Sequence, residues 1–126
     1  MKLLTKTLKQ TTFIILSIML LAISNSALAS ERTGYASWYG PGFHGRLAAD
    51  GSRFNQNQLT AAHRTLPFGS KVRVTCTTTG KSTVVKITDR GPFHGNRVMD
   101  LSKAAAKEIG MLDKGVSKIK YELLKD

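Results

Sequence analysis

Asp89 is the residue of this sequence whose type and position most favour chemistry. It ends the segment 83–89, in which Val85 and Ile87 alternate with polar residues. Side chains alternate between the two faces of a strand, so we expect Asp89 on the same inward side as these apolar residues. Partial burial favours the protonated form of a carboxyl group, which suits a general acid. In the other interpretation, Asp89 only accepts backbone hydrogen bonds in the turn that follows, and the sequence leaves both open.

His63 is a second candidate. It ends the segment LTAAH, and in a strand it would lie on the same side as two apolar residues before it. A histidine in such a position either packs in the core or takes part in a site, and the sequence leaves both roles open. His44 and His94 each stand in a Phe-His-Gly turn, so a metal site of two histidines and an aspartate is conceivable. No H-x-H or H-x-x-x-H spacing supports it, and we expect neither a metal nor a cofactor.

Other reactive or aromatic side chains give weaker signals. Ser37 and Ser52 lie outside any G-x-S-x-G context, so serine hydrolysis has no support in the sequence. Trp38 and Tyr39 are adjacent aromatic residues that could stack on sugar rings or pack in a core. The single cysteine, Cys76, excludes an intramolecular disulfide and is interpreted as a small buried hydrophobic residue.

Short alternating segments, punctuated by glycine, predict that most of these residues stand on or beside strands. The clearest segments are 34–39, 71–77, 83–89 and 118–123, with a hairpin turn at 78–81. One short helix is expected at about 102–110, where Ser102 can cap the N-terminus and Gly110 the C-terminus. We therefore predict a mainly β fold, a small closed barrel with one helix, because closure removes the exposed strand edges.

Composition limits the classes of protein and partner. The chain has 126 residues, 41% of them hydrophobic, which predicts one compact domain and excludes a disordered protein. Its 19 lysines and arginines against 8 acidic residues give a net charge of +11, so anionic partners such as wall polymers are expected. The positive residues are scattered and form no run, which argues against nucleic acid as a partner.

The first 29 residues have the layout of a secretory signal peptide. Lysines at positions 2, 6 and 9 precede the apolar segment 13–23, and the small-x-small sequence Ala-Leu-Ala at 27–29 is typical of a cleavage site. Cleavage would leave a domain of residues 30–126 in the periplasm, the cell wall or outside the cell. The loss of three lysines would lower the net charge from +11 to +8. The residue directly after the cleavage site is Ser30 and not a cysteine that could carry a lipid, so no stable membrane anchor is expected, although an uncleaved segment would be one.

Four segments carry a resemblance to a known family. GYASWYGPGFHGR (34–46), LTAAHRTLPFGSKVRV (59–74), TDRGPF (88–93) and RVMDLSKAAAKEIGM (97–111) closely resemble the rare lipoprotein A (RlpA) family of endolytic peptidoglycan transglycosylases. The resemblance implies a six-stranded double-psi β-barrel, also found in expansins, and cleavage of peptidoglycan glycan strands that lack stem peptides. It further implies that Asp89 is the catalytic acid and that His63 lines the same groove. We expect the protein to act as a monomer.

The reaction that the resemblance implies needs only one carboxyl group. An acid protonates the glycosidic oxygen, and its carboxylate then takes the proton of the muramic acid 6-hydroxyl, which closes on C1 to leave a 1,6-anhydro end. Substrate contacts are expected from Ser52, Asn55, Trp38, Tyr39 and Arg90.

One segment departs from the family pattern. Relatives commonly read G-E-x-F-D where residues 51–55 of this chain read GSRFN, so two acidic groups are missing, although Ser52 and Asn55 can still hydrogen-bond sugar hydroxyls. The alternative function is therefore a non-catalytic, expansin-like module that binds or loosens cell-wall glycan. A secreted protein that binds other polyanions is a third, weaker hypothesis.

Overall fold

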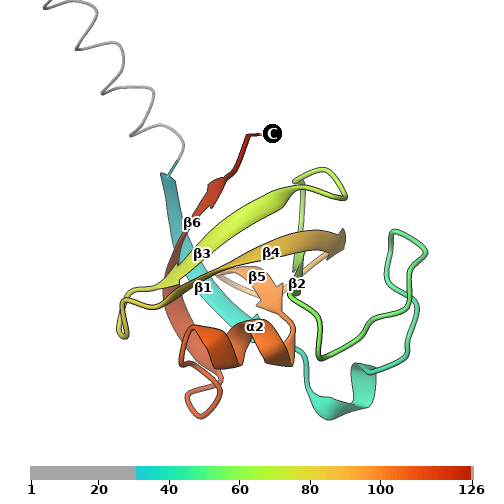
Figure 1. Ribbon diagram of the computed structural model, residues 1–126, viewed down its shortest axis with the longest axis horizontal. Coiled ribbons are helices and arrows are strands. Elements are labelled where there is room, and N and C mark those ends of the chain that lie inside the picture. The colour runs from blue at the N-terminus through green and yellow to red at the C-terminus, as the bar shows by residue number, and fades with distance from the viewer. Residues whose placement is uncertain (1–30, 126) are drawn as a thin grey trace, which may run out of the picture. The chain divides into compact units, whose positions relative to one another are not determined.

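The computed structural model describes residues 31–125, and the predicted signal peptide lies outside them. Figure 1 shows a small barrel of strands, with helix α2 beside it and a long loop between β1 and β2. The strands are β1 (Glu31–Trp38), β2 (Thr60–His63), β3 (Lys71–Cys76), β4 (Ser82–Asp89), β5 (Arg97–Leu101) and β6 (Val116–Leu123). The helices are the 3₁₀ turn η1 (Pro41–Phe43) and the α-helix α2 (Lys103–Glu108).

The six strands close into a barrel in the order β1-β5-β2-β4-β3-β6. β1 pairs with β5, and β2 with β4, in parallel, whereas the pairs β2–β5, β3–β4 and β3–β6 are antiparallel. Parallel neighbours cannot be joined by a tight turn, so long connections must cross the barrel. The predicted six-stranded double-psi β-barrel with one short helix is confirmed.

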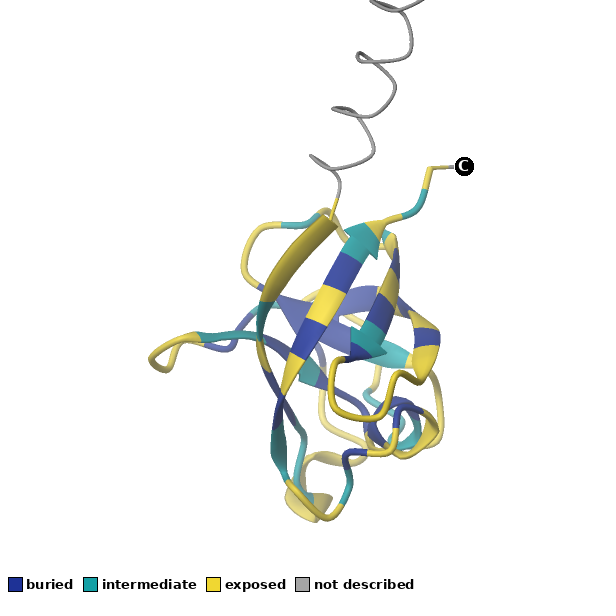
Figure 2. Ribbon diagram, turned by 90° about the vertical axis from the view of Figure 1, so that its left-hand side faces the viewer, coloured by how far each residue is buried: buried dark blue, intermediate teal, exposed yellow. Residues whose placement is uncertain are grey.

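Alternation of apolar and polar residues explains why β3 and β4 form where they do. Val72, Val74 and Cys76 are buried on β3, while Lys71 and Arg73 are exposed. β4 repeats this pattern, and the two strands pair through five residues on each side. Figure 2 shows the same alternation as bands of buried and exposed residues along the strands. The interior of the barrel is thus filled by one side of each strand.

Helix α2 closes one end of the barrel. Ser102 caps it by accepting a hydrogen bond from the backbone N–H of Ala105 at 3.2 Å, as the sequence predicted. Ala105 and Ala106 are fully buried against the core, and Gly110 follows the helix with φ of 75°, a conformation that favours glycine. The helix is shorter at both ends than the predicted 102–110. No helix of residues 31–125 is long and apolar enough to cross a membrane.

The pairing register brings two aspartates of different strands to one region. Asp89, at the end of β4, pairs with Ala62 of β2, and Asp100 of β5 pairs with Ser37 of β1. The long loop 39–59 between β1 and β2 also reaches this end of β4, because the backbone N–H of Asp50 donates to the carbonyl of Thr88 at 3.1 Å. The barrel therefore sets the spacing of groups that the sequence separates widely.

The barrel core predicts a clear contrast between two positions of β4. Ile87 is fully buried, so Ile87→Ala should lower the free energy of unfolding by about 2–5 kcal/mol, through lost burial and an unfilled cavity. Val84 on the same strand is 38% exposed, so Val84→Ala should lower it by less than about 1 kcal/mol. Urea unfolding followed by circular dichroism measures both values. Similar losses for the two variants would contradict this assignment of the core.

Candidate active site

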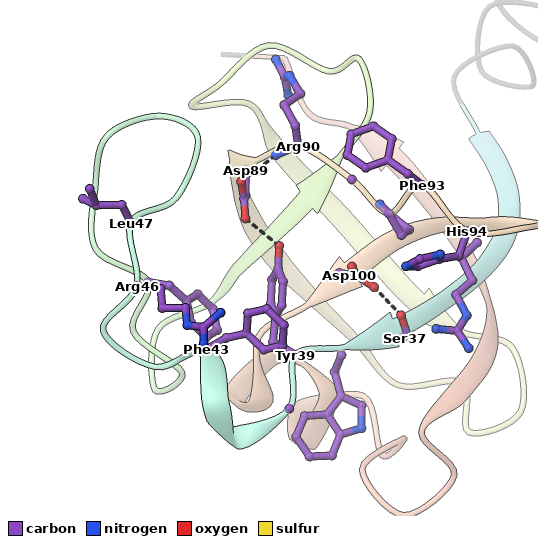
Figure 3. A pocket seen from close by; sticks show the side chains of 16 residues that line it. Ser37, Tyr39, Phe43, Arg46, Leu47, Asp89, Arg90, Phe93, His94 and Asp100 are labelled. Atoms are coloured by element: carbon purple, nitrogen blue, oxygen red, sulfur yellow. Dashed lines mark hydrogen bonds between the residues drawn. The ribbon is translucent and has the colours of Figure 1, made fainter.

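A cavity of about 500 Å³ lies at the end of the barrel where β4 meets the loop 39–59, and polar and aromatic side chains line it (Figure 3). Its walls come from the end of β1, the loop 40–54, the end of β4 with the loop after it, and β5. The hydroxyl-bearing and ionisable residues of its lining are Ser37, Tyr39, Arg46, Asp89, Arg90, His94, Arg97 and Asp100. The cavity therefore joins two stretches of the chain, residues 37–54 and 89–100, that are far apart in sequence.

Asp89 is half-buried at the rim of this cavity and accepts three hydrogen bonds. Its Oδ1 accepts from the backbone N–H groups of Ala49 and Arg90, both at 2.9 Å. Its Oδ2 accepts from the hydroxyl of Tyr39 at 2.8 Å, the contact drawn as a dashed line in Figure 3. Both interpretations from the sequence thus have a structural basis: Asp89 braces the turn through Oδ1, and it also faces the cavity, where Oδ2 has a single protein partner.

Tyr39 holds the second oxygen of Asp89 in place. Its ring packs against Phe43 and Phe54, with centroids 5.3 and 4.8 Å away. Burial raises the pKa of Tyr39 far above its usual range, and the hydrogen bond to Asp89 and the charges of Asp89 and Asp100 raise it further. The phenol consequently keeps its proton. A tyrosine hydroxyl both donates and accepts, so it can hydrogen-bond Asp89 in either protonation state.

A second carboxylate in the cavity was not singled out from the sequence. Asp100 accepts a short hydrogen bond from the hydroxyl of Ser37, and Figure 3 shows the pair facing each other. Asp100 lies between the fully buried Met99 and Leu101 on β5, so strand parity alone assigns it to the outer face. That face forms a wall of the cavity only because loops cover it, and the local sequence pattern of β5 cannot indicate that loops lie there.

Arg90 braces a turn with its side chain. Its guanidinium donates to the carbonyls of His63 and Leu66 at 3.2 and 2.8 Å and lies 3.9 Å from the centroid of the Phe68 ring. Although Arg90 contributes to the cavity wall, Figure 3 shows its side chain directed away from Tyr39 and the other labelled groups.

His63 is buried, 6% exposed, and does not line the cavity. Its Nδ1 accepts from the backbone N–H groups of Thr65 and Leu66, both at 3.1 Å, so Nδ1 carries no proton. Nε2 therefore holds the proton of the neutral ring and faces the hydroxyl of Tyr121 at 3.5 Å. Burial, followed by the charges of Arg32, Arg90 and Arg64, lowers the pKa of His63 below its usual value.

The remaining predicted site residues divide between the cavity and its surroundings. Trp38 lines the cavity, packs on the core and donates from Nε1 to the carbonyl of Leu112 at 3.3 Å. Ser52 and Asn55 lie on the loop 40–59 outside the cavity wall. The hydroxyl of Ser52 donates to Asp50, and the amide oxygen of Asn55 accepts from a backbone N–H two residues on. In the described part of the chain, no three His, Cys, Asp or Glu side chains gather as a metal-binding group.

The closed barrel, with a carboxylate-bearing cavity at its end, defines a double-psi β-barrel protein. Residues 31–121 match the family described as lytic transglycolase. The chain belongs to this family, which confirms the resemblance found in the sequence.

Relatives in this family carry explicit names. The chain is 60% identical over 91 residues to the probable endolytic peptidoglycan transglycosylase RlpA of Synechocystis, a match that covers 72% of this chain and 28% of that protein. It is 52% identical over 98 residues to the endolytic peptidoglycan transglycosylase RlpA of Neisseria meningitidis serogroup A, covering 78% of this chain and 41% of that protein. The chain thus spans less than half the length of these curated relatives.

Solved structures of other double-psi barrels are similar in fold. Streptomyces papain inhibitor superposes with a TM-score of 0.61 at 25% identity, over 75% of this chain and 94% of that chain. An expansin from Clavibacter michiganensis gives a TM-score of 0.61 at 20% identity, over 76% of this chain and 51% of that chain.

The environment of His63 predicts how stability depends on pH. A lowered pKa in the folded state means that the unfolded chain binds this proton more readily, so the contribution of neutral His63 is present above about pH 6.5 and is lost on acidification. His63→Asn keeps an acceptor for the turn but cannot titrate. Its melting temperature should therefore fall less than that of the wild type between about pH 7 and pH 5. Parallel pH curves in differential scanning calorimetry would contradict this role.

Proposed function

We propose that the protein is a lytic transglycosylase that cleaves the glycan strands of peptidoglycan, with Asp89 as the group that gives and takes the proton. The observation that carries this proposal is the Asp89 carboxylate, fixed by three hydrogen bonds with its Oδ2 at the cavity. General acid catalysis requires such a positioned carboxyl group within reach of the reacting oxygen. The names of the family and of its relatives support the same reaction.

The shape and rim of the cavity suit a carbohydrate chain. A volume of about 500 Å³ lies within the range of ligand sites. Phe43, Leu47 and Phe93 border it and are 44%, 66% and 74% exposed, which leaves apolar surfaces for the C–H faces of sugar rings. Polar groups deeper in the cavity can then hydrogen-bond the sugar hydroxyls.

The proposed reaction uses the two protonation states of Asp89 in turn. Asp89 donates its proton to the glycosidic oxygen between N-acetylmuramic acid and N-acetylglucosamine, and the bond from that oxygen to C1 breaks. The 6-hydroxyl of the same muramic acid attacks C1 and releases its proton to the Asp89 carboxylate. The protonated acid is restored, no water is consumed, and the product ends in 1,6-anhydro-N-acetylmuramic acid.

Other predicted site residues act around this centre in the proposal. Tyr39 keeps Oδ2 of Asp89 directed at the substrate through their 2.8 Å hydrogen bond. His63 is a positioning residue, because its carbonyl accepts from the Arg90 guanidinium and its ring holds the turn 63–66. Ser52 and Asn55 are assigned to sugar contacts beyond the cavity, and Trp38 to its floor.

The place of action follows from the substrate. We propose that residues 1–29 direct export and are removed, and that residues 30–126 act as a monomeric domain on the wall polymer, in the periplasm or outside the cell. The excess of positive charge favours approach to an anionic wall.

A second candidate function is a non-catalytic module that binds or loosens wall glycan. The similarity to expansins supports it, since one Clavibacter michiganensis expansin is described in complex with cellohexaose. Ser52 and Asn55 also favour this second function, because they carry no charge where the family pattern commonly has acids. Formation of the anhydro product distinguishes the two functions.

Asp89→Asn should reduce glycan cleavage by about 10²–10⁴-fold, because asparagine can neither donate a proton to the leaving oxygen nor accept one from the 6-hydroxyl. Tyr39→Phe should reduce kcat less, by about 10–100-fold, because it removes one hydrogen bond to a charged group. Mass spectrometry of anhydro-muropeptides and anhydro-disaccharides released from sacculi measures both effects.

Glycan affinity and melting temperature of the same two variants provide the control. Both should stay near the wild-type values for Asp89→Asn, since the amide oxygen can still accept from the backbone N–H groups. A parallel loss of stability, binding and turnover would mean that Asp89 only stabilises the turn after β4. Undiminished product from Asp89→Asn would remove it as the acid.

Removal of stem peptides should increase turnover. A peptide on the lactyl group of muramic acid must fit past the rim formed by Phe93 and Leu47, whereas a bare strand meets no such obstacle. Sacculi pre-treated with an amidase should therefore release anhydro product faster than intact sacculi at equal glycan content. Equal rates on the two substrates would count against a preference for peptide-free strands.

A further inference from the structure

Arg97 lines the cavity, and its side chain has no hydrogen-bond or ion-pair partner among residues 31–125. It is half-buried on β5 and lines the same cavity as Asp89. Its backbone is fixed, because its N–H donates to the carbonyl of His94 at 3.3 Å and its carbonyl accepts from Arg64 at 3.0 Å. Within residues 31–125, no hydrogen bond or ion pair engages its side chain. A partly buried cation at the cavity is therefore available to a ligand.

The other two arginines of the cavity are less suited to this role. Arg90 donates to the carbonyls of His63 and Leu66 and stacks on a phenylalanine ring, so its side chain is already used. Arg46 is exposed and lies 5.3 Å from the centroid of the Phe43 ring, where water screens its charge. Arg97 is thus the guanidinium group best placed to bind an anion in the cavity.

Negative charge already present in the cavity makes such a cation significant. Asp89 and Asp100 both line the wall, and Asp100 lies three positions after Arg97 on the same strand. Asp100, and Asp89 whenever it is ionised, would repel an anionic ligand unless a positive group met it. A guanidinium can bind a carboxylate through two parallel hydrogen bonds, which gives both charge and geometric selectivity.

We propose that Arg97 binds the free lactyl carboxylate of muramic acid and thereby selects glycan strands that have lost their stem peptides. This inference rests on the proposed function. In an intact strand the lactyl carbonyl is part of an amide and carries no charge. Removal of the peptide leaves a carboxylate on the ring that reacts. Arg97 therefore distinguishes the two strands by charge, in addition to the bulk that the rim excludes.

The test separates charge from bulk with a matched pair of substrates. One is a peptide-free glycan strand, and the other is the same strand with its lactyl carboxyl groups converted to methylamides. The wild type should show a kcat/KM about 10–100-fold higher on the carboxylate form, as expected for a hydrogen bond to a charged group. Arg97→Gln should lose most of this difference, chiefly through KM, and should process the methylamide at the wild-type rate. Arg97→Lys should be intermediate.

Two further variants serve as controls. Lys71→Gln removes one positive charge from β3, outside the cavity, and should keep the full preference. Arg46→Gln should keep most of it. Loss of the preference in Arg46→Gln but not in Arg97→Gln would overturn the assignment, as would equal losses of Arg97→Gln on both substrates or a wild type that does not distinguish them.

Affinity measurements in the Asp89→Asn background keep the inference separate from the catalytic proposal. If the wild type cleaves neither strand, the proposed function fails. Calorimetry with the two glycans then still tests Arg97, because the carboxylate form should bind more tightly only when Arg97 is present. Equal affinities of Asp89→Asn for the two glycans would refute the role of Arg97.

Discussion

The carboxylate of Asp89 accepts three hydrogen bonds, two of them from the loop between β1 and β2, and the rest of the site depends on this convergence. Tyr39 approaches from the end of β1, Ala49 from the long loop, and Arg90 from the next position along the backbone. A buried or half-buried carboxylate that lost one of these donors would be left under-satisfied. The same contacts that hold the acid in place therefore also hold the loop against the barrel.

Much of the barrel could be predicted from local pattern. β3, β4 and β6 have one buried and one exposed side, so alternation identifies them, and Ser102 and Gly110 mark the ends of α2. β2 is different. Ala61, Ala62 and His63 are consecutive buried residues of β2, because the strand is covered on both faces and alternation vanishes. The number of strands came from the family resemblance and not from periodicity.

The site was less accessible to sequence reasoning than the fold. Asp89 could be singled out because its parity is a local property of β4. The Ser37–Asp100 pair joins residues 63 positions apart, and only the parallel pairing of β1 and β5 brings them together. The ring of His63 is held inward because its Nδ1 accepts hydrogen bonds from two backbone N–H groups of the turn after β2. Contacts of this kind arise from tertiary structure and leave no periodic pattern in the sequence.

The exposed rim has a consequence for how this protein can diversify. Leu47 and Phe93 are 66% and 74% exposed and belong to loops. The strands that position Asp89 pack around a core that does not include these two residues. Substitutions at such positions change stability little, so new side chains can be sampled there without loss of the barrel. Selection or engineering could thus change which ligand enters the cavity while Asp89 stays where it is.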